Sequence, residues 1–220
     1  MIPPTPEARA GFIAENTRLQ RPPHTPEIQL HLADEITPIW RLTEERLSQI
    51  GLPPPFWAFA WAGGQALARY VLDHAEVVAG RRVLDFACGS GIVGIAAMRA
   101  GAADAVGADI DPFCGAALAL NAQANGVVVG YAGQDLLGAA PPAWAEVILA
   151  GDICYEKPLA ERVMAWLQAA RRAGATVLIG DPGRSYFPKS GLTKLAEYEV
   201  PTTRELEDMA VKKTAVWALP

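Results

Sequence analysis

From residue 81 to the C-terminus, short apolar runs alternate with segments of helical length, and this alternation constrains the fold more than any other feature. The runs Val147–Ala150 and Thr176–Ile179 are almost continuously apolar, as in strands that helices cover on both faces. Such alternation predicts a doubly wound, mostly parallel α/β sheet. The expected strands are 82–86, 104–109, 127–131, 146–151 and 175–180, and the expected helices are 92–100, 113–125 and 156–172.

The C-terminal part of the chain predicts an antiparallel edge to this sheet. Two further strands, 197–200 and 214–219, follow with little helix between them, so we expect a seven-strand, Rossmann-like sheet in total. We expect an N-terminal helical and strand extension over residues 1–55 and the main domain over 56–220. Before residue 81, the sequence predicts helices over 5–20, 37–50 and 65–75 and a half-exposed strand over 27–32.

Composition narrows the class of protein. The 220 residues are 51% hydrophobic and 20% charged, which suits a globular domain with a sizeable core. A net charge of −5 disfavours a broad nucleic-acid surface. Three cysteines without a C-x-x-C spacing indicate reduced thiols in the cytoplasm and no metal site. Because we find neither a transmembrane run nor a targeting segment, we expect a soluble protein without a membrane partner.

A glycine-rich turn follows the first strand of the main domain. Gly89, Gly91 and Gly94 form a G-x-G-x-x-G arrangement, which brings backbone close to a ligand in nucleotide-binding domains of many kinds. Asp85 precedes it, and a carboxylate there would repel a pyrophosphate. S-adenosylmethionine, which carries a sulfonium and no phosphate, suits this acid better than NAD. An NAD-dependent oxidoreductase remains an alternative, since Asp109 is also an acid beyond the glycines, but no proton-transfer pair such as Tyr-x-x-x-Lys is evident.

Polar residues also stand at the ends of the other strands, where open α/β sheets bind ligands. Asp109 is placed to accept hydrogen bonds from ribose hydroxyls, whereas we expect Asp111 to cap the next helix. The segment 134–138 either binds an adenine amine or forms an Asx-type turn. Asp152 lies at the mouth of the expected site, where we expect it to meet the acceptor. At the last strand end, 180–184, Asp181 and Arg184 either contact the substrate or belong to a turn, and turn chemistry explains them adequately.

An aromatic cluster precedes the glycine pair Gly63-Gly64. It packs four aromatic residues into six positions, from Phe56 to Trp61. These rings either plug the sheet as core or place Trp57 or Trp61 at the rim of the ligand site, where a ring attracts a cation or stacks on a base. The sequence leaves these two alternatives open.

Taken together, Asp85-x-x-Cys-Gly-Ser-Gly91, Asp109 and Asp152-Ile-Cys-Tyr155 resemble class I, seven-strand S-adenosylmethionine-dependent methyltransferases. More narrowly, D-x-x-Y after the fourth strand resembles the protein lysine methyltransferases that carry this motif. The stretch from Trp57 to Tyr70 is most similar to the branch that methylates the β subunit of electron transfer flavoprotein. Ala62 departs from the pattern, since we expect proline after the second tryptophan.

The resemblance implies a protein-lysine N-methyltransferase that uses S-adenosylmethionine, releases S-adenosylhomocysteine and needs no metal, with the flavoprotein β subunit as its substrate. A small-molecule amine such as nicotinamide is the alternative acceptor. The motif [N/D]-P-P-[Y/F/W] of enzymes that methylate base amines is absent. The implied catalytic residues are Asp152 and Tyr155. The implied cofactor-binding residues are Trp61, Asp85, Ala87, Cys88, Gly89, Ser90, Gly91, Asp109, Ile110, Gln134, Asp135, Leu136 and Gly151.

Overall fold

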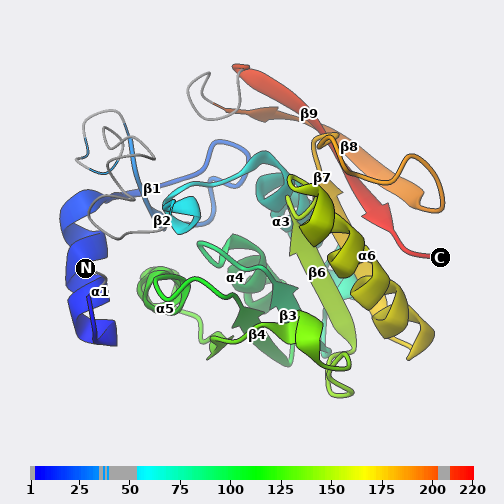
Figure 1. Ribbon diagram of the computed structural model, residues 1–220. Helices are drawn as coiled ribbons and strands as arrows, with labels where there is room; N and C mark the ends of the chain where they lie inside the picture. Colours follow the sequence, from blue (N-terminus) through cyan, green and yellow to red (C-terminus); the bar gives the residue numbers. More distant parts are fainter. Residues whose placement is uncertain (1–2, 35–36, 38, 40–53, 203–208) are drawn as a thin grey trace.

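The computed structural model describes residues 3–34, 37, 39, 54–202 and 209–220. Its centre is a seven-stranded sheet with the order β5-β4-β3-β6-β7-β9-β8 (Figure 1). Strands β3 to β7 run parallel, and β9 pairs antiparallel with both β7 and β8. This confirms the expected mostly parallel sheet with an antiparallel edge. The strands are β3 (Arg82–Phe86), β4 (Asp104–Ala108), β5 (Gly130–Ala132), β6 (Val147–Gly151), β7 (Thr176–Asp181), β8 (Thr193–Pro201) and β9 (Val211–Ala218).

Helices cover both faces of the sheet. Because side chains alternate along a strand, β3 directs Val83 to one face and Leu84 to the other. Val83 lies in a buried cluster with α3 (Ala62–Asp73) and α4 (Ile92–Arg99). Leu84 lies in a second cluster with α6 (Lys157–Arg172), which crosses the sheet beside β6 and β7 (Figure 1). Burial on both faces explains why β6 and the middle of β7 are continuously apolar.

The N-terminal segment packs against α5 (Cys114–Ala124). It contains α1 (Pro6–Asn16) and a small antiparallel pair, β1 (Arg18–Gln20) and β2 (Leu30–Leu32). Two asparagine side chains, one in α5 and one at its C-cap, fix the main chain around β2. Asn121 Oδ1 accepts from the His31 amide at 2.7 Å, and Asn125 Oδ1 accepts from the Gln29 amide at 2.9 Å.

Several expected boundaries before residue 81 were wrong or lie outside the described residues. The helix expected over 5–20 ends at Asn16, because Thr17 turns to extended backbone and its hydroxyl donates to the Ile13 carbonyl at 2.6 Å. The strand expected over 27–32 covers only Leu30–Leu32. The helix expected over 37–50 falls almost wholly on residues that the structure does not describe. The division at residue 55 therefore stays a prediction.

Helix α3 begins at Ala62, three residues earlier than expected, and includes the glycine pair in its first turn. Glycine normally weakens a helix, which is why the sequence placed the pair before it. The structure gives a packing reason for Gly63. A Cβ at this position would collide with the Gly180 carbonyl and would lie 2.6 Å from Asp152 Oδ2. The glycine thus lets α3 approach the ends of β6 and β7.

The strand order places a ligand crevice between β3 and β6. The chain builds β3, β4 and β5 in one direction and then returns to the other side of β3 with β6 (Figure 1). In open α/β sheets, ligands bind beyond the carboxyl ends of the strands at such a reversal. Among the described residues, no helix is both long and apolar enough to cross a membrane.

Candidate active site

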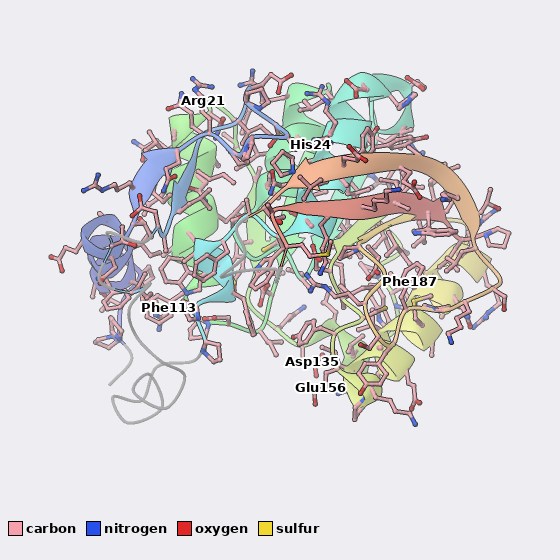
Figure 2. All side chains as sticks on the ribbon, turned by 90° about the horizontal axis from the view of Figure 1, so that it is seen from above. Arg21, His24, Phe113, Asp135, Glu156 and Phe187 are labelled. Atoms are coloured by element: carbon pink, nitrogen blue, oxygen red, sulfur yellow. The ribbon has the colours of Figure 1, made fainter. Side chains whose placement is uncertain are left out.

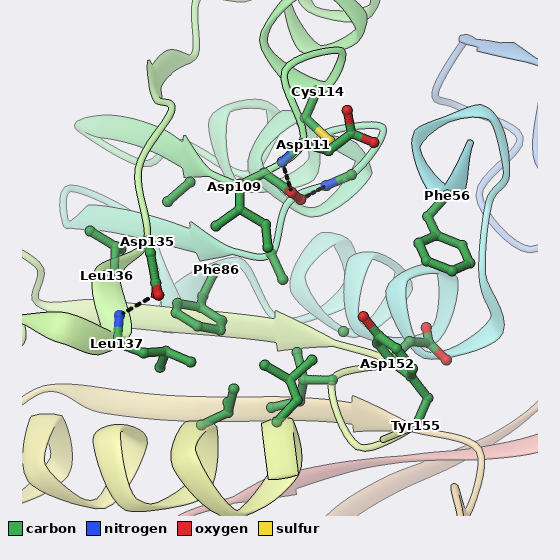
Figure 3. A pocket seen from close by; sticks show the side chains of 18 of the residues that line it. Phe56, Phe86, Asp109, Asp111, Cys114, Asp135, Leu136, Leu137, Asp152 and Tyr155 are labelled. Carbon is green, nitrogen blue, oxygen red and sulfur yellow. Dashed lines mark hydrogen bonds between the residues drawn. The ribbon is translucent and has the colours of Figure 1, made fainter. Parts of the chain in front are cut away.

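A cavity of about 860 Å³ opens at the carboxyl ends of β3, β4 and β6. Figure 3 shows Asp135 and Leu136 at one end, Asp152 and Tyr155 at the other, and Asp109 between them. The expected site residues that line the cavity are Trp61, Ala87, Gly89, Asp109, Ile110, Gln134, Asp135, Leu136, Gly151, Asp152 and Tyr155.

The glycine turn presents main chain to this cavity. Ala87, Gly89 and Gly91 all have positive φ, at 56°, 49° and 80°. A Cβ on Gly89 would meet nothing within 4 Å, so this residue leaves open space at the cavity wall. A Cβ on Gly91 would instead collide with the Leu118 side chain. Gly91 therefore serves close packing, while Gly89 keeps the wall open to a ligand.

Asp85 lies behind the turn and outside the cavity lining. It is 1% exposed, and its Oδ2 accepts from the Gly94 amide at 2.8 Å. Burial raises the pKa of Asp85 to about 8, and the charge of Asp109 adds to this, while the Gly94 bond opposes it. The side chain therefore ties β3 to α4. The other expected residues that are buried outside the lining are Cys88, Ser90 and Gly91.

Asp109 follows β4 and links two loops. Its Oδ2 accepts from the Gly89 amide and its Oδ1 from the Asp111 amide, both at 3.0 Å (Figure 3). The Tyr131 hydroxyl donates to the carbonyls of Asp109 and Asp111 and so braces this turn. Asp111 accepts from the Phe113 amide at 2.8 Å, one residue before α5 begins. It therefore closes the turn before the helix, and Phe113, rather than Asp111, stands at the N-cap.

At the far end of the cavity, Asp135 forms the Asx-type turn that was one of the two alternatives. Its Oδ1 accepts from the Leu137 amide at 2.8 Å and caps a short 3₁₀ turn, Leu136–Gly138. Its Oδ2 lies 3.4 Å from Arg162 Nη2. Ile110 lines the same cavity and is 74% exposed. An exposed apolar side chain in a cavity suits a flat, apolar part of a ligand.

Asp152 is fixed at the end of β6 with a positive φ of 55°. Its amide donates to the Gly180 carbonyl at 3.0 Å, and its Oδ2 accepts from the Gly64 amide at 2.9 Å. Its Oδ1 accepts from Arg184 Nη2 at 2.7 Å and from Nε at 3.2 Å. Positive φ in a non-glycine residue costs roughly 1–3 kcal/mol and is concentrated at functional sites. The chain thus holds this carboxylate with main-chain bonds in a strained conformation.

The aromatic cluster is divided between the core and the cavity, so both alternatives of the sequence apply to different rings. Trp57 is 1% exposed and stacks on Phe113, which also packs against Phe12 of α1. Figure 2 shows Phe113 beside α1. Trp61 instead lines the cavity, and its Nε1 donates to the Phe56 carbonyl at 2.9 Å. Trp57 is therefore a core residue and Trp61 a residue of the cavity wall.

Tyr155 lies at the cavity mouth, half-exposed, with its ring 5.9 Å from that of Phe56. Partial burial raises the pKa of the Tyr155 phenol, and the charges of Asp109 and Glu156 raise it further. The hydroxyl accordingly keeps its proton near neutral pH. A neutral phenol can donate one hydrogen bond and accept others.

Comparison with known proteins identifies the family. The chain is 38% identical over 214 residues to the electron transfer flavoprotein β subunit lysine methyltransferase of Danio rerio. The matched region covers 94% of this chain and 81% of the relative. The Homo sapiens protein of that name is 37% identical over 223 residues, covering 96% and 82%. The chain belongs to this methyltransferase family. The NAD-oxidoreductase alternative is therefore set aside.

More distant matches agree with this fold. The family described as ribosomal protein L11 methyltransferase matches residues 65–152 of this methyltransferase, from α3 to Asp152. The magnesium protoporphyrin IX methyltransferase of Synechocystis, solved with bound SAM, has a TM-score of 0.52 at 17% identity and covers 71% of this chain and 78% of that one. The ribosomal protein L11 methylase of Lactobacillus delbrueckii has a TM-score of 0.50 at 19% identity, covering 72% and 79%.

The sequence of this methyltransferase did not reveal the contact that the Arg184 side chain makes in the site. The sequence offered substrate contact or a turn for Arg184, and Asp181 Oδ1 does accept from the amides of Gly183 and Arg184 in a turn. The side chain, however, crosses to β6 and pairs with Asp152. The available signal was a basic residue just beyond a strand end, and its partner depends on which strands are neighbours. The sequence also did not reveal that Gly63 and Gly64 pack against Asp152.

Proposed function

We propose that this protein transfers methyl groups from S-adenosylmethionine to lysine side chains of the electron transfer flavoprotein β subunit. The observation that carries the proposal is the identity of 37–38% to proteins of that name over 94% of the chain. The position of Asp152 and Tyr155 supports it, since both line the same cavity as Asp109 and Gly89. We also propose that the protein acts in the cytoplasm, on a protein and not on a nucleic acid or a membrane.

The cavity fits a nucleoside cofactor of this kind. A volume of about 860 Å³ accommodates a ligand of drug-like size. In our proposal, Asp109 accepts hydrogen bonds from the ribose hydroxyls, and Gly89 and its neighbours in the turn pass close to the methionine part. We also propose that Gln134 and Asp135, which line the cavity, bind the adenine amine and that Leu136 packs against the ring. Bound S-adenosylmethionine supplies an activated methyl group, so we propose that the transfer needs no metal.

The acceptor end would receive a lysine between Asp152 and Tyr155. A lysine amine has an ordinary pKa of about 10.4 and must lose its proton before it attacks. Burial favours the neutral amine, whereas the Asp152 carboxylate favours the ammonium, so the two effects oppose each other. We therefore assign Asp152 to capture and orientation of the acceptor and not to strong base catalysis. The Tyr155 hydroxyl would accept a hydrogen bond from the amine or form the channel wall.

The chain's contribution to the transfer is alignment. Displacement at the sulfonium methyl requires the amine, the methyl carbon and the sulfur in line, with reacting atoms about 3–3.5 Å apart. The main-chain bonds from Gly64 and to Gly180 fix Asp152 before any substrate arrives. A carboxylate that is already in place loses little conformational entropy when the amine binds.

Incubation with S-adenosylmethionine labelled in its methyl group and a cell lysate tests the reaction class. We expect label in a protein band of the size of the flavoprotein β subunit. The Asp152→Ala variant should still bind S-adenosylhomocysteine and should transfer no methyl. Label confined to the low-mass fraction would favour a small-molecule amine instead, and unchanged turnover by Asp152→Ala would remove Asp152 from the mechanism.

A further inference from the structure

We propose that Arg184 is a resident cation of the acceptor site, which occupies the place of the target lysine beside Asp152 and is displaced when that lysine enters. The proposal rests on the lysine methylation proposed above. Arg184 Nη2 lies 2.7 Å from Asp152 Oδ1, and the two side chains are only 19% and 11% exposed. Both residues line the cavity, so the ion pair stands in the space that an acceptor must reach.

The surroundings of the guanidinium are those of a cation site. Its central carbon lies 5.6 Å from the centre of the Trp61 ring. Phe56 contacts both Trp61, at 5.8 Å between ring centres, and Tyr155, at 5.9 Å. A carboxylate with aromatic faces attracts ammonium and guanidinium groups alike. The chemistry that holds Arg184 is therefore also the chemistry that would receive a lysine.

Asp152 has main-chain bonds that do not involve Arg184. The Gly64 amide holds its Oδ2, and the Asp152 amide is bonded to the Gly180 carbonyl. The backbone of Arg184 is held at the end of a turn, where its amide donates to Asp181 Oδ1 at 2.8 Å. The arginine side chain has several rotatable bonds beyond that point. The carboxylate can thus keep its position while the guanidinium moves away.

This arrangement has a consequence for selectivity. A ligand that binds only when a resident group has left shows an apparent affinity reduced by the fraction of molecules in the competent state. A small free amine has few contacts besides those of its ammonium group with which to offset this loss of apparent affinity. A folded protein substrate makes further contacts around the cavity mouth, and these contacts can drive the displacement. Arg184 would accordingly disfavour free amines and favour a lysine on a protein surface.

The test uses the full chain and two variants, Arg184→Ala and Arg184→Gln, with a blocked lysine (Nα-acetyl-lysine N-methylamide) and the flavoprotein β subunit as acceptors. We expect both variants to lower KM for the blocked lysine by roughly tenfold, with kcat no higher than in the unchanged protein. Guanidinium chloride below denaturing concentrations should compete with the lysine in Arg184→Ala but not in the unchanged protein. Potassium chloride controls for ionic strength. Arg82→Ala, which removes a surface pair with Glu146 at the opposite ends of the strands, is the matched control variant.

A different pattern of kinetic constants would show that Arg184 holds Asp152 in its active position and does not block the acceptor site. In that case kcat falls in Arg184→Ala, KM stays unchanged, and guanidinium restores the activity. Calorimetry of guanidinium binding to Arg184→Ala separates this proposal from the proposed function, because it needs no turnover. We expect Arg184→Ala to bind guanidinium saturably. The double variant Arg184→Ala/Asp152→Ala should not bind it. The resident-cation proposal is overturned if the affinity of Arg184→Ala for guanidinium is no higher than that of the unchanged protein. This result would count against it even if the protein methylates lysines.

Discussion

Replacing Gly63 with alanine tests whether the close approach of α3 sets the position of Asp152. The new Cβ would collide with the Gly180 carbonyl and would lie 2.6 Å from Asp152 Oδ2 and 2.8 Å from Cγ. The carbonyl cannot retreat alone, because it accepts from the Asp152 amide at 3.0 Å. The substitution therefore pushes on the carboxylate and on the strand end that carries it.

The size of the effect follows from these distances. An ordinary contact to a Cβ begins near 3.4 Å, so the carboxylate must move by about 0.8 Å. Overpacking of this kind costs about 1–3 kcal/mol of stability. A displacement of order 1 Å in a group that aligns the reactants lowers the rate by roughly 100-fold. We expect Gly63→Ala to remain folded with a lower Tm and to lose activity by about this factor.

The assay measures kcat with saturating S-adenosylmethionine and flavoprotein β subunit, together with the affinity for S-adenosylhomocysteine and the Tm. Gly63 does not line the cavity, so we expect product affinity to change by less than about threefold. Gly64→Ala is the control, because its Cβ would meet only Ile92 Cγ2, at 3.4 Å, and its amide is retained. That variant should gain about 0.5–1 kcal/mol of stability. A folded Gly63→Ala with unchanged kcat would refute the reasoning.

Three further variants address the cofactor half, the buried carboxyl and the acceptor wall. Asp109→Ala removes the acceptor of two loop amides and should weaken the binding of S-adenosylhomocysteine, measured by calorimetry, by about 10- to 100-fold. The control Asp104→Ala, at the exposed start of β4, should leave this affinity unchanged. Equal losses of affinity in the two variants would contradict a specific role of Asp109 in cofactor binding. Burial raises the pKa of Asp85 to about 8 from an ordinary 3.8, so the folded state keeps a proton that the unfolded chain releases. The contribution of Asp85 to the free energy of unfolding should therefore fall by about 1.4 kcal/mol for each unit of rising pH between about pH 4 and 8. Asp85→Asn should remove this slope, which urea titrations at several pH values measure. If the free energy of unfolding changes with pH in the same way in both proteins, Asp85 is not the cause. Tyr155→Phe keeps the ring and should lower kcat/KM for lysine by roughly tenfold with unchanged cofactor affinity; an unchanged kcat/KM would leave the hydroxyl without a role.

Much of the architecture could be predicted because it depends on local patterns. Continuous apolar runs identified the central strands, and strand–helix alternation implied that the sheet is parallel. The carboxyl ends of parallel strands meet at one edge, so Asp109 and Asp152 were expected to lie near the glycine turn. All three line one cavity. These positions could be predicted because residue spacing along the chain alone determines them.

The remaining features depend on which elements become neighbours. Gly63 and Gly64 are read locally as helix breakers, yet α3 needs Gly63 to approach β6 and β7. Trp57 and Trp61 are similar in sequence context, and only their packing separates a core ring from a cavity wall. The pairing of Arg184 with Asp152 joins the ends of two adjacent strands, a contact that no spacing within the chain reveals.

The proposal that this protein methylates lysines of the electron transfer flavoprotein β subunit is tested most directly by mass spectrometry. The purified β subunit is incubated with the protein and S-adenosylmethionine, digested, and analysed for methylated lysine, with Asp152→Ala as the control for catalysis. We expect methyl groups on lysine side chains of the β subunit with the unchanged protein and none with the variant. A β subunit that stays unmodified while S-adenosylmethionine is consumed on another acceptor would contradict the account.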